Sequence, residues 1–201
     1  MKKQSVLDNI KITNEKMKNM ERIRSKAHIK RHNNAFIFMK PYIKSYKEEP
    51  ILDIGCRDGH ILEILKENGF TNLHGLDVVK KYLIDKDVNY YNCDAAQMDK
   101  IFDEESFSAV IISHVLEHMV DPDIVINQIH RILEPDGMLY IEIPLESKIR
   151  PNQGHFTFFK KPKHLYTLLE NKFEILETFQ DIKQKEALIT RVWLRVVARR
   201  V

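Results

Sequence analysis

Short apolar runs of strand length alternate with amphipathic stretches of helix length from residue 51 to the end of the chain. Strands that alternate with helices build a mostly parallel sheet, because right-handed crossovers place the helices on its two faces. The pattern therefore predicts an α/β fold. The expected strands cover residues 51–54, 73–77, 88–93, 107–113, 138–143, 173–179 and 191–199, and the expected helices cover residues 60–68, 124–133 and 161–171.

The first 50 residues have a different pattern, which is helical and basic. Apolar residues fall near one face at helical spacing up to Ala27, and lysines and arginines occupy the other faces. Asn33 and Asn34 interrupt the pattern, and residues 36–46 resume it as a second, aromatic-rich helix despite Pro41. A basic amphipathic helix can bind RNA or a membrane surface, but a cap packed on the domain is commoner. We expect a helical cap at residues 1–48 and one compact unit at residues 49–201.

A glycine turn follows the first expected strand, in the sequence Ile-Leu-Asp-Ile-Gly-Cys-Arg-Asp-Gly at residues 51–59. Gly55 and Gly59 let the backbone turn tightly and approach a ligand. About twenty residues further on, the second strand ends at Asp77, where a carboxylate can accept hydrogen bonds from a ribose. The dinucleotide fingerprint G-x-G-x-x-G is absent, because Arg57 stands at its second glycine. A ribose-containing ligand other than a dinucleotide is indicated, although ordinary strand-turn-helix units also use such turns.

The frame Asp53-x-Gly55-x-x-x-Gly59 resembles the first motif of the class I S-adenosylmethionine-dependent methyltransferases. Asp94, after the third strand, matches the family position whose carboxylate faces the adenine amino group. Residues 114–122 are similar to the L-E-H motif of the branch that includes the ubiquinone and menaquinone biosynthesis methyltransferases. The resemblance implies S-adenosyl-L-methionine as cofactor and S-adenosyl-L-homocysteine as product. It also implies a Rossmann-like sheet of seven strands, with the last strand antiparallel between the fifth and sixth.

The same resemblance places the cofactor at the carboxyl ends of the strands. Methyl transfer mainly needs alignment and desolvation, but a hydroxyl acceptor would benefit from a general base, and His114 and His155 are the candidates. Residues 154–159 could close over the substrate, or their aromatic side chains could anchor the loop to the core. The cofactor-binding residues implied by the resemblance are Asp53, Gly55, Cys56, Gly59, Asp77, Val78, Asp94, Ala95 and His114.

Several kinds of chemistry are not indicated. The end of the fourth strand lacks the Asp or Asn-Pro-Pro-aromatic motif of DNA amino-methyltransferases, and neither Cys56 nor Cys93 stands where a cytosine-C5 enzyme has its nucleophile. We expect two buried thiols and no disulfide. Asp121 and Asp123 are typical of a helix start, so we predict no metal site.

Charge is distributed unevenly. Residues 1–50 contain 13 basic and 5 acidic residues, residues 51–145 contain 7 and 18, and residues 146–201 contain 12 and 6. Such basic flanks could attract an anionic metabolite or RNA. No run approaches the roughly twenty apolar residues of a membrane span, and we expect a cytoplasmic protein.

Three functions are compatible with these patterns. The leading interpretation is a methyltransferase acting on a small molecule, the second is an RNA-modifying methyltransferase, and the third is a regulatory protein that binds the cofactor without turnover. DNA is not an expected partner. The sequence leaves open the acceptor atom, which can be O, N or C, and the choice between monomer and homodimer.

Overall fold

The protein is described by a computed structural model, which covers residues 25–79, 85–146, 154–185 and 188–201 of the 201-residue chain. One seven-stranded sheet has the order β3-β2-β1-β4-β5-β7-β6. β7 pairs antiparallel with both β5 and β6, and the other neighbours are parallel. The predicted Rossmann-like fold is therefore confirmed. The strands are β1 (Ile51–Ile54), β2 (Leu73–Asp77), β3 (Asn89–Asn92), β4 (Phe107–Ser113), β5 (Leu133–Leu145), β6 (Phe173–Lys185) and β7 (Leu188–Arg200).

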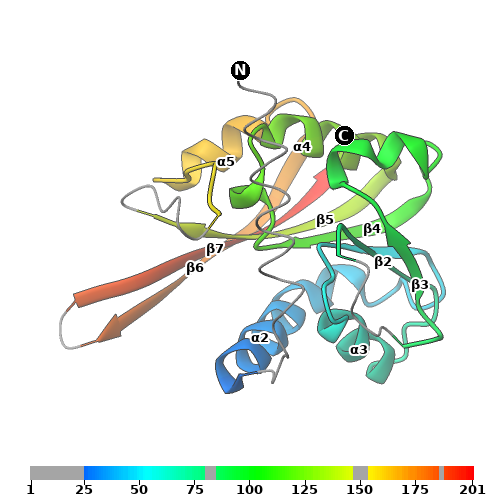
Figure 1. The fold of residues 1–201 in the computed structure, drawn as a ribbon, viewed down its shortest axis with the longest axis horizontal. Helices are drawn as coiled ribbons and strands as arrows, with labels where there is room; N and C mark the ends of the chain where they lie inside the picture. Colours follow the sequence, from blue (N-terminus) through cyan, green and yellow to red (C-terminus); the bar gives the residue numbers. More distant parts are fainter. Residues whose placement is uncertain (1–24, 80–84, 147–153, 186–187) are drawn as a thin grey trace.

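Helices cover both faces of the sheet, as Figure 1 shows, with α2 and α3 on one side and α4 and α5 on the other. Two short 3-10 helices, which the sequence pattern does not predict, follow β3 and β4. The helices are α2 (Lys26–Ile43), α3 (His60–Glu67), η1 (Ala95–Lys100), η2 (Leu116–His118), α4 (Pro122–Ile132) and α5 (Pro162–Leu169).

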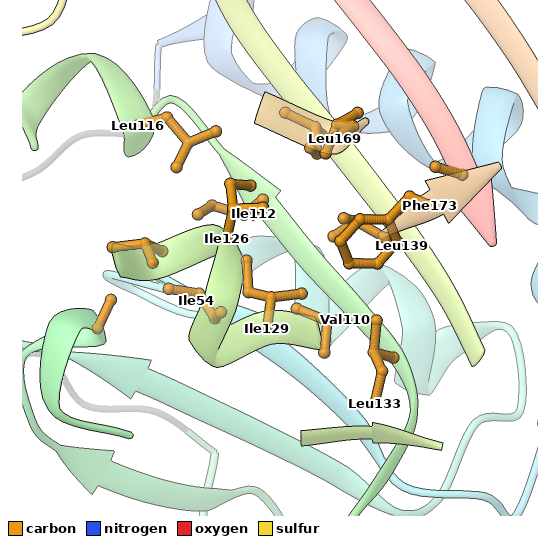
Figure 2. Close-up of a cluster of buried hydrophobic side chains, with 14 of the residues drawn as sticks. Ile54, Val110, Ile112, Leu116, Ile126, Ile129, Leu133, Leu139, Leu169 and Phe173 are labelled. Atoms are coloured by element: carbon orange, nitrogen blue, oxygen red, sulfur yellow. The ribbon is translucent and has the colours of Figure 1, made fainter. Parts of the chain in front are cut away.

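The buried strands supply side chains to two cores, one on each face of the sheet. Side chains alternate along a strand, so Val110 and Ile112 join the core under α4 and α5, while Ala109 and Ile111 join the core under α2 and α3. Figure 2 shows Ile126 and Ile129 of α4 directed toward the first of these cores. Burial on both faces explains why these strands read as continuous apolar runs.

The predicted interruption at Asn33 and Asn34 is wrong, because α2 continues through both residues. Ser25 caps this helix by accepting a hydrogen bond from the His28 backbone N–H at 3.3 Å. The helix buries Ala35, Phe36, Met39 and Ile43 against the sheet. The low helix propensity of asparagine costs only about 0.7 kcal/mol per residue, less than the roughly 1.5–3 kcal/mol gained by burying one large apolar side chain. The apolar positions predicted before Ser25 lie outside the described residues.

The last two strands are longer than expected. We predicted strands at residues 173–179 and 191–199, whereas β6 and β7 each have 13 residues. Their added length forms a hairpin that extends beyond the body of the sheet (Figure 1). The added residues Gln180 to Ile182 are exposed or only partly buried, so this part of the strand lacks the half-buried alternation that sequence patterns detect.

A pair of histidines joins the cap helix to the helix that follows the glycine turn. His32 Nδ1 of α2 lies 2.9 Å from His60 Nδ1, at the first residue of α3. A contact of this kind needs one nitrogen to donate and the other to accept, so the accepting ring is neutral in it. Burial, followed by the nearby positive charge of Arg31, lowers the pKa of His32 to about 3.

We predict that His32 makes the fold less stable in mild acid. Unfolded His32 takes up a proton below a pH of about 6.5, whereas the folded residue does so only near pH 3, so protons favour unfolding throughout this window. His32→Asn should reduce the loss of unfolding free energy between pH 7 and pH 5 by about 1–2 kcal/mol relative to wild type. Urea denaturation at both pH values measures this difference.

His164→Asn is the matched control, because His164 is exposed. It should leave the pH dependence of wild type unchanged. An equal loss of stability in wild type and His32→Asn would contradict the prediction.

Candidate functional site

The glycine turn is tied to the end of the neighbouring strand. The backbone N–H groups of Gly55 and Cys56 both donate to the Leu76 carbonyl, at 2.7 and 3.1 Å. Gly55, Arg57 and Gly59 have left-handed backbone conformations, with φ of 71°, 55° and 72°. Arg57 therefore adopts a conformation that glycine tolerates best, and the turn closes with a side chain at this position.

Gly55 is required for space as well as for its conformation. A Cβ at this position would lie 2.3 Å from Cγ2 of Val115, in the segment that follows β4. The turn after β1 and the segment after β4 are therefore in van der Waals contact. Only a residue without a Cβ allows this close approach.

Asp77 holds the same turn from the end of β2. Its Oδ2 accepts a hydrogen bond from the Arg57 backbone N–H at 2.9 Å, and its Oδ1 accepts one from the Val79 N–H at 2.8 Å. A carboxylate has about four acceptor sites, so anchoring the turn does not by itself prevent Asp77 from accepting a bond from a ligand. Asp77 can thus both anchor the turn and contact a ligand.

The other predicted cofactor residues lie around this edge. Asp53 is buried, and burial, followed by the charges of Asp77 and Asp58, raises its pKa well above the usual range. Asp94 Oδ1 caps η1 by accepting a bond from the Ala96 N–H at 2.9 Å. Ala95 is buried, whereas Val78 is 42% exposed. These residues follow neighbouring parallel strands at their carboxyl ends, where open α/β sheets bind ligands.

The two cysteines differ in environment. Cys56 is buried, and burial raises the pKa of its thiol, which therefore stays protonated. Cys93 is only partly buried, so the expectation of two buried thiols is wrong for this residue. Cys93 follows β3 near the sheet edge, where its Sγ lies 3.4 Å from the Asp94 carbonyl oxygen. Both thiols are free, as expected.

His114 bridges two buried carboxylates at the end of β4. Its Nδ1 lies 3.1 Å from Glu117 Oε1, and its Nε2 lies 3.0 Å from Glu142 Oε1. Burial lowers the pKa of His114, but the hydrogen bonds to the two carboxylates outweigh burial and raise the pKa overall. A general base needs an available ring nitrogen, and both nitrogens of His114 are engaged in this arrangement.

Glu142 is the centre of a buried polar cluster. Burial raises its pKa, but the bond from His114 and the positive charges of Arg195 and Arg31 outweigh burial and lower the pKa to about 2. Arg195 Nε donates to Glu142 Oε2 at 2.6 Å, and the Tyr140 hydroxyl donates to the same oxygen at 3.1 Å. Arg31 of α2 forms an ion pair with Glu142 at 3.4 Å. We call this set, His114, Glu117, Glu142, Arg31 and Arg195, the carboxylate cluster.

Sequence reasoning missed Glu142, Arg31 and Arg195. A detectable signal existed, because one charge interrupts an apolar stretch in each of the two strands β5 and β7. These strands are neighbours, and their register pairs Glu142 directly with Arg195.

The structure places His155 beside His118. Their ring centroids are 4.9 Å apart, and His155 Nδ1 lies 2.9 Å from Glu146 Oε2. The loop that carries His155 is docked on η2, since the backbone N–H groups of Phe156 and Thr157 donate to the Glu117 carbonyl at 2.8 and 3.1 Å. No contact between the rings of His155 and His114 is recorded among the described residues.

Four buried side-chain atoms have no hydrogen-bond partner within the described part of the chain. An unpaired buried polar group costs about 1–3 kcal/mol, so such groups mark places where a ligand can add a partner. Three of the four belong to the carboxylate cluster or to β4 beside it. The atoms are Arg31 Nε, Arg57 Nε, Ser113 Oγ and Glu117 Oε2.

Comparison with known proteins identifies related sequences. A family model described as "Methyltransferase domain" matches residues 21–182. The mitochondrial ubiquinone biosynthesis O-methyltransferase of Bos taurus is 32% identical over 103 residues, which are 45% of this chain and 27% of that protein. The ubiquinone biosynthesis O-methyltransferase of Pseudomonas aeruginosa is 30% identical over 100 residues, 45% of this chain and 42% of that protein. The match thus spans less than half of either relative.

Solved structures share the fold at low sequence identity. Phosphoethanolamine N-methyltransferase 2 of Haemonchus contortus, in complex with S-adenosyl-L-methionine, has a TM-score of 0.70 at 16% identity, covering 84% of this chain and 52% of that one. The N-methyltransferase NodS of Bradyrhizobium japonicum, in complex with S-adenosyl-L-homocysteine, has a TM-score of 0.67 at 18% identity, covering 88% of each. The [4+2]-cyclase SpnF has a TM-score of 0.71 at 15% identity, covering 87% and 82%.

The contact between Gly55 and Val115 generates a stability prediction. Gly55→Ala should destabilise the fold by about 2–4 kcal/mol, because it combines a strained left-handed alanine with an overpacked contact. Gly69→Ala is the matched control, since Gly69 also has a positive φ but a Cβ there would meet only Lys47 Nζ, at 3.9 Å. It should lose only about 1–2 kcal/mol.

Adding Val115→Ala to Gly55→Ala should recover part of the loss, because it removes the atom in the way. Chemical denaturation of the three variants and of Val115→Ala alone measures this coupling. Equal losses in Gly55→Ala and Gly69→Ala, with no recovery in the double variant, would show that the contact is unimportant.

Proposed function

The chain belongs to the methyltransferase-domain family, and we propose that it transfers the methyl group of S-adenosyl-L-methionine to a small-molecule acceptor. The family match confirms the resemblance to class I methyltransferases drawn from the glycine turn and the motifs after it. The observation that supports the proposal is the left-handed glycine turn held by Asp77, because it places a tight backbone turn and a carboxylate side by side on one edge of the sheet.

The residues of this edge fit such a cofactor. In the proposed arrangement, the turn from Gly55 to Gly59 holds the amino-acid end, Asp77 accepts hydrogen bonds from the ribose, and Asp94 faces the adenine amino group. When bound, S-adenosyl-L-methionine supplies an electrophilic methyl group. The partly exposed Val78 and the buried Ala95 would line the two sides of the base, and the close packing of Val115 against Gly55 would limit access of water to the turn.

We assign the acceptor to the side of the carboxylate cluster. Ser113 ends β4 and Glu117 lies in η2 just after it, and Arg31 reaches the same cluster from the cap helix. Ser113 Oγ, which has no hydrogen-bond partner among the described residues, could bond a small polar acceptor here, and the positive charge of Arg31 permits an anionic one. Ubiquinone biosynthesis O-methyltransferases, named for a small-molecule pathway, support this class.

His114 and His155 remain the proposed residues flanking the acceptor. Because both nitrogens of His114 bind carboxylates, we propose that His114 positions Glu117 and Glu142 rather than accepting a proton. Alignment and desolvation would then supply most of the rate. The cytoplasmic location and the oligomeric state stay predictions, and none of the helices in the described ranges is long and apolar enough to cross a membrane.

A reaction other than methyl transfer is the second candidate. It is favoured by one observation, the structural likeness to a protein named as a [4+2]-cyclase. That likeness concerns the fold alone, whereas the family model spans residues 21–182 and is described as a methyltransferase domain. We therefore rank methyl transfer first.

We predict that the protein binds S-adenosyl-L-methionine and S-adenosyl-L-homocysteine and has no useful affinity for NAD. Asp77→Ala should weaken binding of S-adenosyl-L-homocysteine by about 1.5–3 kcal/mol, the range for hydrogen bonds to a charged group. Isothermal titration calorimetry of wild type with all three ligands, and of the variant with S-adenosyl-L-homocysteine, measures both effects.

The control is Asp103→Ala, because Asp103 is exposed. Its affinity for S-adenosyl-L-homocysteine should equal that of wild type. Since Asp77 also anchors the turn, a far-UV circular dichroism spectrum should accompany each titration. The proposal fails if NAD binds tightly and neither adenosyl compound binds, and the ribose role fails if folded Asp77→Ala binds as wild type does.

A further inference from the structure

We propose that Glu117, His118 and His155 form a binding site for one divalent transition-metal ion of the Zn²⁺ type. One candidate ligand atom from each of these residues lies within 4.8 Å of the other two. Glu117 and His118 belong to η2, and His155 belongs to the loop after β5, so the site joins two separate segments. This inference replaces the sequence-based expectation of no metal.

The two imidazoles are already oriented as metal ligands usually are. His118 Nδ1 lies 3.0 Å from the Gly154 carbonyl oxygen, and His155 Nδ1 lies 2.9 Å from Glu146 Oε2. In both rings the hydrogen bond places the proton on Nδ1 and leaves Nε2 as the atom that can bind a metal. Metal-binding histidines characteristically donate their second nitrogen to a carbonyl or a carboxylate in this way.

Glu117 supplies an independent observation that points to a ligand. Its side chain is almost fully buried, with the residue 1% exposed. Oε1 binds His114 Nδ1 at 3.1 Å, while Oε2 has no hydrogen-bond partner among the described residues. A buried carboxylate oxygen without a partner is costly, and a cation shared with the two adjacent imidazoles would compensate it.

The backbone holds the ligands together without the ion. Phe156 and Thr157 donate their N–H groups to the Glu117 carbonyl, and the Thr157 hydroxyl donates to the Met119 carbonyl at 2.6 Å. These bonds dock the His155 loop on η2, so little of the binding energy would be used to order the loop.

The ligand set selects the class of metal. Two imidazole nitrogens and one carboxylate oxygen suit Zn²⁺, Fe²⁺ or Co²⁺, whereas Mg²⁺ and Ca²⁺ prefer sites made of oxygen atoms. Three protein ligands leave at least one coordination position for water or another ligand. Coordination through Nε2 of His155 would occupy the nitrogen that a general base needs, so the ligand role excludes the base role for this residue.

The test is metal binding by tag-free, chelator-treated protein in the absence of any S-adenosyl compound. Zn²⁺ is titrated by calorimetry, and Co²⁺ is titrated by its visible absorption, which reports the geometry of its ligands. We expect one equivalent of each ion to bind and to raise the melting temperature, because the ion binds only the folded state. Mg²⁺ should bind at least about a hundredfold more weakly than Zn²⁺.

Variants assign the binding to this site. His118→Ala, His155→Ala and Glu117→Gln should each weaken Zn²⁺ binding by about a hundredfold or more and change the Co²⁺ spectrum. Glu146→Gln, which replaces the carboxylate partner of His155 with a neutral amide, should weaken binding about ten- to a hundredfold. His164→Ala, at an exposed histidine outside the site, should bind as wild type does.

Glu117 is buried and its variant could unfold, so His155→Ala and Glu146→Gln, both in or beside the loop, keep the test independent of that risk. The proposal is overturned if wild type binds neither Zn²⁺ nor Co²⁺ at one equivalent, or if folded His118→Ala and His155→Ala bind both ions unchanged. Preference for Mg²⁺ over Zn²⁺ would also overturn it. Because no adenosyl compound is present, these outcomes are independent of whether methyl transfer is the correct function.

Discussion

The rest of the structure depends on one fully buried carboxylate, whose negative charge must be compensated by hydrogen-bond donors and positive charges around it. Glu142 lies in the middle of the sheet with no exposed surface, and a buried charge of this kind destabilises a protein unless donors surround it. Those donors come from β4, β5, β7 and the cap helix, so the requirements of a single side chain fix the relative positions of four elements. The polar groups on the acceptor side of the proposed site belong to the carboxylate cluster. Their positions therefore follow from the same requirement.

The cap helix is held at two consecutive residues that reach in different directions. Arg31 pairs with Glu142 at the centre of the sheet, while His32 contacts His60 at the start of the helix after the glycine turn. One turn of α2 therefore contacts both the carboxylate cluster and the helix after the glycine turn. A displacement of this helix would disturb both sides together.

The elements that the sequence predicted well are those with local signals. The turn at Gly55 and the helix start at Asp121 and Pro122 each follow from spacing or turn chemistry within a few residues, whereas the place of the last strand was implied by the family resemblance. Glu142 and Arg195 are 53 positions apart, and only the strand register brings them together. The weak preference of Asn33 and Asn34 against helix was overridden by the packing of α2 on the sheet. The contact between His118 and His155 depends on a loop path that no local pattern encodes.

The contact between Gly55 and Val115 has a consequence for how this sequence can diverge. The cofactor turn and the segment after β4 belong to separate motifs, yet one methyl group fills the space that any side chain at position 55 would need. Substitutions that enlarge residue 115 would therefore press on the backbone of the turn. Among homologues, the residue at this position should be limited in size wherever the turn keeps its glycine, so that each of the two motifs restricts how the other can change.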